Sequence, residues 1–166
     1  MSEIDSTEEE ALATLEGQFM RALRLKDQGR VDDAEDELRR ILKVEPRLAE
    51  PHMELSRLLL DTNRVRDAEP HAREALQYLQ SGGQWTDEIP EHVLLALAHG
   101  LLAEVLRRMA DEDDVIFGSP EQFRELVNES QHHFAEASKL DPSDEYSSFH
   151  AFFLGMGDTK TPTPDA

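Results

Sequence analysis

Apolar residues recur at helical spacing along most of the chain. In the first run they stand three or four residues apart, as on one face of an amphipathic helix, at Ala11, Leu12, Leu15, Phe19, Ala22, Leu23 and Leu25. A second run, over residues 31–44, stops before Pro46, which cannot continue a helix. The same pattern predicts helices over residues 48–60, 67–79, 90–109, 119–140 and 143–154. The predicted fold class is therefore all-α.

Local signals predict where several of these helices begin and end. A capping box, Ser-Thr-Glu-Glu, predicts that the first helix begins at Ser6, and Gly29 predicts its end. Asp67 is the predicted N-cap of the fourth helix. Pro70 then falls in the first turn, where its missing N–H has no intrahelical partner. Ser119, followed by Pro and then Gln at the third helical position, predicts another helix start.

Two stretches of the chain repeat with a period of 34 residues. Residues 29–34, Gly-Arg-Val-Asp-Asp-Ala, return as residues 63–68, Asn-Arg-Val-Arg-Asp-Ala. On both sides of this match, Leu25, Ala34, Ile41 and Leu42 recur as Leu59, Ala68, Ala75 and Leu76. A period of this length is typical of stacked helical repeats, which present an extended concave surface rather than a deep pocket.

The positions that recur carry small residues where two helices would cross. In the first copy they are Ala22, Leu25, Gly29, Ala34, Leu38, Ile41 and Pro46, and in the second Leu55, Ser56, Leu59, Asn63, Ala68, Ala72 and Ala75. This pattern resembles the tetratricopeptide repeat (TPR). The resemblance implies a right-handed α-α superhelix of about three helix pairs plus a C-terminal capping helix. Gln18 and His52 depart from it, since an aromatic residue is common there, as does Gln80, where the closing Pro belongs.

The expected domain covers residues 6–154, between a flexible N-terminus (1–5) and a disordered tail (155–166). Its repeats span residues 15–48 and 49–82, followed by a divergent copy over 90–142 whose register the sequence leaves open. An insertion containing Trp85 precedes that copy, and an acidic turn over residues 111–118 interrupts it. The capping helix, 143–154, carries an aromatic stripe: Tyr146, Phe149, Phe152 and Phe153.

Charge limits the classes of partner. The 36 acidic and 17 basic residues give a net charge of −19, which repels phosphate backbones, so we expect no nucleic-acid partner. The chain has no apolar run of 18 residues and no secretion leader, so we expect no membrane partner and a cytoplasmic location. It has no cysteine, which excludes disulfides and thiolate metal sites.

Motifs for catalysis are absent: there is no G-x-S-x-G, phosphate-binding glycine loop or His-Glu-x-x-His. His132 and His133 lie near Glu129 and Glu136 on one predicted helix. Because a structural zinc site uses four ligands, we interpret these histidines as solvated. The remaining histidines show no ligand spacing: His52, His71, His92, His99 and His150. We therefore expect neither an enzyme nor a bound cofactor.

The resemblance implies that the first helix of each pair lines a concave groove. The groove residues would be Glu16, Phe19, Met20, Leu23, Lys26 and Asp27 from the first copy, with Glu50, Met53, Glu54, Arg57, Leu60 and Asp61 from the second. Its apolar strip suits an amphipathic helix or an extended apolar peptide. Phe19 and Leu23 either line the groove or pack only on neighbouring helices.

The leading hypothesis is a non-catalytic adaptor that binds a peptide or helix of a partner protein in this groove. A first alternative is a dedicated secretion chaperone for an apolar client, since the chain resembles the type III translocator chaperones in length and layout. A second alternative is a self-assembling structural subunit, such as a homodimer, formed through the aromatic C-terminal helix.

Overall fold

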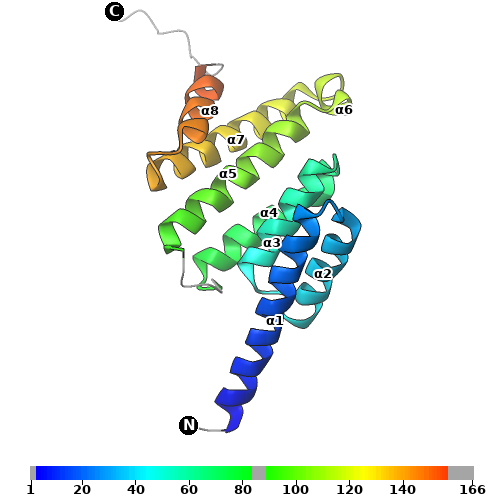
Figure 1. Ribbon diagram of the computed structural model, residues 1–166. Coiled ribbons are helices and arrows are strands. Elements are labelled where there is room, and N and C mark those ends of the chain that lie inside the picture. Colours follow the sequence, from blue (N-terminus) through cyan, green and yellow to red (C-terminus); the bar gives the residue numbers. More distant parts are fainter. Residues whose placement is uncertain (1–2, 84–88, 157–166) are drawn as a thin grey trace, which may run out of the picture.

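The computed structural model describes residues 3–83 and 89–156, with side chains described for residues 14–83 and 89–152. Within these ranges the chain forms helices and no strands, which confirms the all-α class (Figure 1). The helices are α1 (Glu3–Asp27), α2 (Val31–Val44), α3 (Ala49–Asp61), α4 (Val65–Gln80), α5 (Glu91–Ala110), α6 (Asp113–Ile116), α7 (Pro120–Leu140) and α8 (Glu145–Met156). The insertion around Trp85 and the tail from residue 157 lie outside the described residues.

The helices pack as three successive pairs: α1 with α2, α3 with α4, and α5 with α7. Contacts of α2 with α3 and of α4 with α5 join the pairs, and α8 covers α7 at one end (Figure 1). The N-terminal part of α1 projects beyond α2. None of the helices in the described ranges is both long and apolar enough to cross a bilayer.

Three tight turns end α1, α3 and α4 in the same way. Gly29, Asn63 and Gly82 have positive φ angles of 77°, 61° and 84°. Glycine and, less readily, asparagine adopt this left-handed conformation at helix ends. In each turn the next residue donates its backbone N–H to a carbonyl five residues earlier, as Arg30 does to Leu25 at 2.8 Å. The 34-residue echo in the sequence therefore encodes a repeated turn.

Two of the predicted helix starts are wrong. α4 begins at Val65 rather than after Asp67, because the left-handed turn at Asn63 starts the helix two residues later, as Gly29 does for α2. Pro70 consequently lies inside α4, where its missing N–H removes the bond to the carbonyl of Arg66. The first helix begins at Glu3, so Ser6 is not its N-cap and residues 3–5 are helical.

The predicted start at Ser119 is confirmed. Its side-chain oxygen accepts a hydrogen bond from the backbone N–H of Gln122 at 3.2 Å, and Pro120 is the first helical residue. The acidic turn before it contains the short helix α6, which the sequence pattern did not indicate.

Small residues occupy the crossing points within each pair, as expected. Ala22, Ala34, Ser56 and Ala68 are almost fully buried. In the α3/α4 pair the Ser56 hydroxyl donates to the carbonyl of Ala68 at 2.8 Å. A larger side chain at such a position would overpack the crossing, at a cost of about 1–3 kcal/mol.

The α5/α7 pair repeats this crossing with the two partners exchanged. Ser130 on the second helix donates to the carbonyl of Ala103 on the first, at 2.7 Å. The two partners are 27 residues apart in sequence, against 12 for Ser56 and Ala68, because the acidic turn and α6 lie between them. This bond places Ala103 and Ser130 where α5 and α7 cross, as Ser56 and Ala68 lie where α3 and α4 cross.

Candidate functional site

A cleft of about 340 Å³ lies between α3, α5 and the first turn of α8. Its walls combine apolar and charged side chains from elements far apart in sequence. Leu60 and Leu101 are buried at its base, whereas Leu97 is 46% exposed. The remaining lining residues are Arg57, Asp61, Ala96, Gly100, Glu104, Arg108, Asp144, Tyr146 and Ser147. This volume is large enough to take one or two side chains of a partner and lies at the lower end of the range for ligand pockets.

Several charged groups of the cleft are already held by neighbours. Arg108 donates to the carbonyl of Leu60 at 3.1 Å and to the Asn63 side chain at 3.0 Å. Glu104 accepts hydrogen bonds from Arg107 and from the Tyr146 hydroxyl, each at 2.7 Å. These bonds join α3 to α5 and α5 to α8, so they stabilise the walls of the cleft.

The hydrogen bonds also keep Glu104 ionised. Burial by itself raises the pKa of Glu104, but the bonds from Arg107 and Tyr146 outweigh it and bring the pKa below its ordinary value. Burial and the bond to Glu104 raise the pKa of the Tyr146 hydroxyl. Glu104 thus stays charged near neutral pH and serves as a fixed acceptor rather than as a proton carrier.

Three of the groove residues predicted from the sequence line this cleft: Arg57, Leu60 and Asp61 on α3. On α1, Glu16 and Met20 are exposed, as is Asp27. Lys26 of α1 forms an ion pair with Glu54 of α3 at 3.3 Å, which joins the first pair to the second. These α1 residues do not line the cleft.

The apolar part of the predicted strip lies mainly in the core. Phe19 and Met53 are half-buried and pack against core clusters, and Leu23 is half-buried on α1. Glu50, predicted to face the groove, is buried. Phe19 packs on neighbouring helices and keeps part of its side chain exposed, so both alternatives stated for it stay open.

The walls of the cleft that α5 and α8 form were not predicted from the sequence. The sequence did not predict the positions of Leu97 and Glu104, because it left the register of the third copy open. It assigned Tyr146 to the capping helix. The only sequence signal is the strongly apolar 90–109 segment, whose exposed member Leu97 cannot be distinguished from its buried neighbours by pattern alone.

Two histidine pairs, which the sequence analysis treated as scattered residues, also join helices. His52 of α3 and His71 of α4 bring their Nδ1 atoms within 3.0 Å, and His99 of α5 and His133 of α7 bring theirs within 2.9 Å. Each pair occupies equivalent positions, four residues before and three residues after the crossing residues. The expectation that His133 is solvated is wrong, since its side chain is only 12% exposed.

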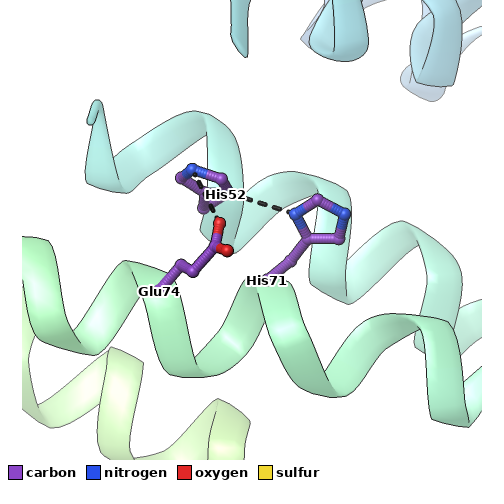
Figure 2. A group of neighbouring side chains, drawn as sticks. All are labelled: His52, His71 and Glu74. Carbon is purple, nitrogen blue, oxygen red and sulfur yellow. Dashed lines mark hydrogen bonds and ion pairs between the residues drawn. The ribbon is translucent and has the colours of Figure 1, made fainter. Parts of the chain in front are cut away.

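Glu74 of α4 adds a carboxylate to the first pair. It lies one helical turn after His71, on the same face, and its Oε2 is 3.3 Å from Nε2 of His52 (Figure 2). One ligand atom from each of these three residues lies within 4.8 Å of the others. His52 is buried and His71 half-buried, whereas the Glu74 side chain is 45% exposed.

The second pair has its nearest carboxylate engaged elsewhere. Glu129 is 3.8 Å from Nε2 of His133, but both of its oxygens accept hydrogen bonds from Arg73, at 2.6 and 3.1 Å. Burial, followed by repulsion from His99 and His132, lowers the pKa of His133 to about 4. Both imidazoles of this pair have lowered pKa values, since burial also lowers that of His99.

No protein-family model matches the chain, and no curated protein matches it.

Proposed function

We propose that the protein is a non-catalytic adaptor with a tetratricopeptide-like superhelix, and that it binds a peptide or helix of a partner protein in the α3/α5/α8 cleft. The observation that carries this proposal is the exposed Leu97 in a cleft whose base is apolar and whose rim is charged. An apolar side chain of the partner would insert against Leu97 and Leu60. The recurrence of the helix crossing at Ser56 and Ser130 supports a repeat architecture.

The charges favour a partner with basic residues beside its apolar anchor. Three acidic residues of the cleft, Asp61, Glu104 and Asp144, outnumber its two arginines, and the chain as a whole carries a net charge of −19. Long-range attraction would therefore speed association with a basic segment, and salt would weaken it.

A displayed library of random peptides tests this proposal. Peptides selected on the wild-type protein would be counter-screened against a Leu97→Lys, Asp61→Lys variant shown by circular dichroism to be folded, since both changes oppose a basic, apolar ligand. The matched control is Val44→Lys, because Val44 is 68% exposed on α2, away from the cleft. We expect peptides with an apolar residue next to basic ones, lost at least tenfold in affinity on the cleft variant and retained by the control. Equal binding by all three proteins would refute the cleft as the working surface.

A second candidate function is self-association through α8. Phe149 and Phe152 are 60% and 69% exposed, while Tyr146 and His150 of the same helix pack on the buried ring of Phe134. Tyr146 and His150 therefore cover α7, whereas Phe149 and Phe152 present exposed rings. Sedimentation of the wild type and of a Phe149→Ser, Phe152→Ser variant distinguishes the candidates, because a monomeric wild type would exclude self-association.

A further inference from the structure

We propose that His52, His71 and Glu74 form a binding site for a divalent transition-metal ion of the Zn²⁺ class, which ties α3 to α4. The inference is independent of the peptide-binding proposal, since none of these residues lines the α3/α5/α8 cleft.

The hydrogen bonds around His52 prepare its Nδ1 as a ligand. Its Nε2 lies 2.7 Å from the carbonyl oxygen of Pro46, which can only accept, so this nitrogen carries the proton. The neutral ring then presents the lone pair of Nδ1 to Nδ1 of His71. A backbone carbonyl that fixes the tautomer of a histidine in this way is the usual outer partner of a metal-binding imidazole.

The spacing of the two Nδ1 atoms is close to that of a metal chelate. A tetrahedral ion with Zn–N bonds of about 2.0–2.1 Å holds two nitrogens about 3.3 Å apart. The observed separation is 3.0 Å, so the rings need to part by only a few tenths of an ångström. The ion would replace the proton that Nδ1 of His71 donates to Nδ1 of His52. His71 would then carry its proton on Nε2 instead.

Glu74 supplies the third ligand. Its carboxylate lies beside the ring of His52 (Figure 2), with Oε2 3.3 Å from Nε2, and its nearly half-exposed side chain can turn toward the ion without leaving a buried cavity. Two imidazoles and one carboxylate leave the fourth position of a tetrahedral ion open to water, as in catalytic zinc sites. Imidazole ligands select zinc, copper or nickel over magnesium or calcium.

Calorimetric titration of the full chain with Zn²⁺, in excess Mg²⁺ to occupy the acidic surface, tests the site. We expect one bound ion per chain in the wild type. Affinity should fall at least tenfold in Glu74→Gln and further in His71→Gln. The matched control is His133→Gln, which removes the equivalent imidazole from the second pair and should bind Zn²⁺ as the wild type does.

A second readout keeps the test valid if His71→Gln disturbs the fold. Nitrogen NMR of the wild-type imidazoles should show Zn²⁺-induced shifts at Nδ1 of His52 and His71, and Zn²⁺ should raise the melting temperature. The proposal is overturned if the shifts appear only at other histidines, or if His71→Gln and His133→Gln lose Zn²⁺ affinity equally. Absence of a stoichiometric site in the wild type would also overturn it.

Discussion

The α3/α4 and α5/α7 pairs share two kinds of contact where their helices cross, but the carboxylates near these contacts have different partners. Each pair has a buried serine that donates to a carbonyl of the opposite helix, and each has two imidazoles in contact through Nδ1. In α3/α4 the nearby carboxylate, Glu74, is nearly half exposed and lies 3.3 Å from Nε2 of His52. In α5/α7 Arg73 holds Glu129.

Because the histidines are arranged alike in both pairs, the partners of the nearby carboxylate distinguish the proposed metal site from the second pair. Arg73 belongs to α4, so the second pair of helices determines which carboxylate the third pair can use. Glu136 occupies the position equivalent to Glu74 and is paired with Lys139 at 3.1 Å.

The third pair should depend on Phe134 far more than the second depends on the equivalent residue, Ala72. Phe134 is fully buried, and its ring contacts Tyr146 and His150 of α8. Phe134→Ala should lower the free energy of unfolding by about 3–5 kcal/mol, because it leaves a cavity under α8. Urea denaturation measures this. Ala72→Phe should instead destabilise by overpacking, by about 1–3 kcal/mol. A loss below about 1 kcal/mol for Phe134→Ala would contradict the packing described.

The histidine pair of α5/α7 should make stability depend on pH. The unfolded chain protonates His133 below its ordinary pKa of 6.5, whereas the folded chain resists until about 4. The free energy of unfolding should therefore fall as pH drops from 6.5 toward 4, by up to about 1.4 kcal/mol per pH unit for one histidine. The groups that face His133 are His99 of α5, Arg73 of α4, and His132 and Glu129 on its own helix.

Urea denaturation between about pH 7 and about pH 5 isolates this effect from carboxylate titration, because ordinary Asp and Glu side chains have pKa values of about 3.9 and about 4.3. His133→Gln should flatten the dependence. His71→Gln is the control from the other pair and should leave the contribution of His133 in place. Identical slopes in the wild type and His133→Gln would show that the lowered pKa of His133 is not a property of the folded protein.

Releasing Glu129 should make the two pairs more alike. Arg73→Gln removes the guanidinium that holds both carboxylate oxygens, so Glu129 can turn toward His133. In a His71→Gln background, which removes the first site, this change should raise Zn²⁺ affinity about tenfold. Calorimetry measures the gain, and Arg30→Gln, which removes an exposed arginine paired with Asp33 at the start of α2, is the control. No gain would mean that Arg73 is not what distinguishes the pairs.

The two buried serines should contribute equally. Ser56→Ala and Ser130→Ala each remove one hydroxyl bond to a carbonyl that is already part of a helix. Each should therefore cost about 1 kcal/mol. Melting temperatures of the two variants should agree closely. A clearly larger loss for one of them would show that the crossings are equivalent in geometry but not in energy.

Much of the fold could be predicted from the sequence because its signals are local. The bounds of α2 and the start at Ser119 follow from apolar spacing and capping chemistry within a few residues. The left-handed turns at Gly29 and Asn63 follow from residue type. Pro70 was misplaced because the capping preference of Asp67 competed with the turn at Asn63, and the turn prevailed.

The candidate sites could be predicted only in part. Arg57, Leu60 and Asp61 were predicted because the resemblance of the second copy to the tetratricopeptide repeat implied that they face the groove. Leu97, Glu104 and Tyr146 lie beyond the insertion that interrupts the period. The contact of His52 with His71 spans 19 residues and that of His99 with His133 spans 34. Neither spacing places two side chains next to each other on one helix, so neither contact could be recognised from the sequence.

The helices, their tight turns and the acidic surface follow from the sequence, because backbone propensity, capping and charge act over one or two turns of chain. The contacts between side chains of different helices follow only from the tertiary structure. The crossing at Ala103 and Ser130 sets the third pair in register, and with it the wall of the cleft, the second histidine pair and the capture of Glu129 by Arg73. These contacts depend on packing between helices, which periodicity along the chain does not specify.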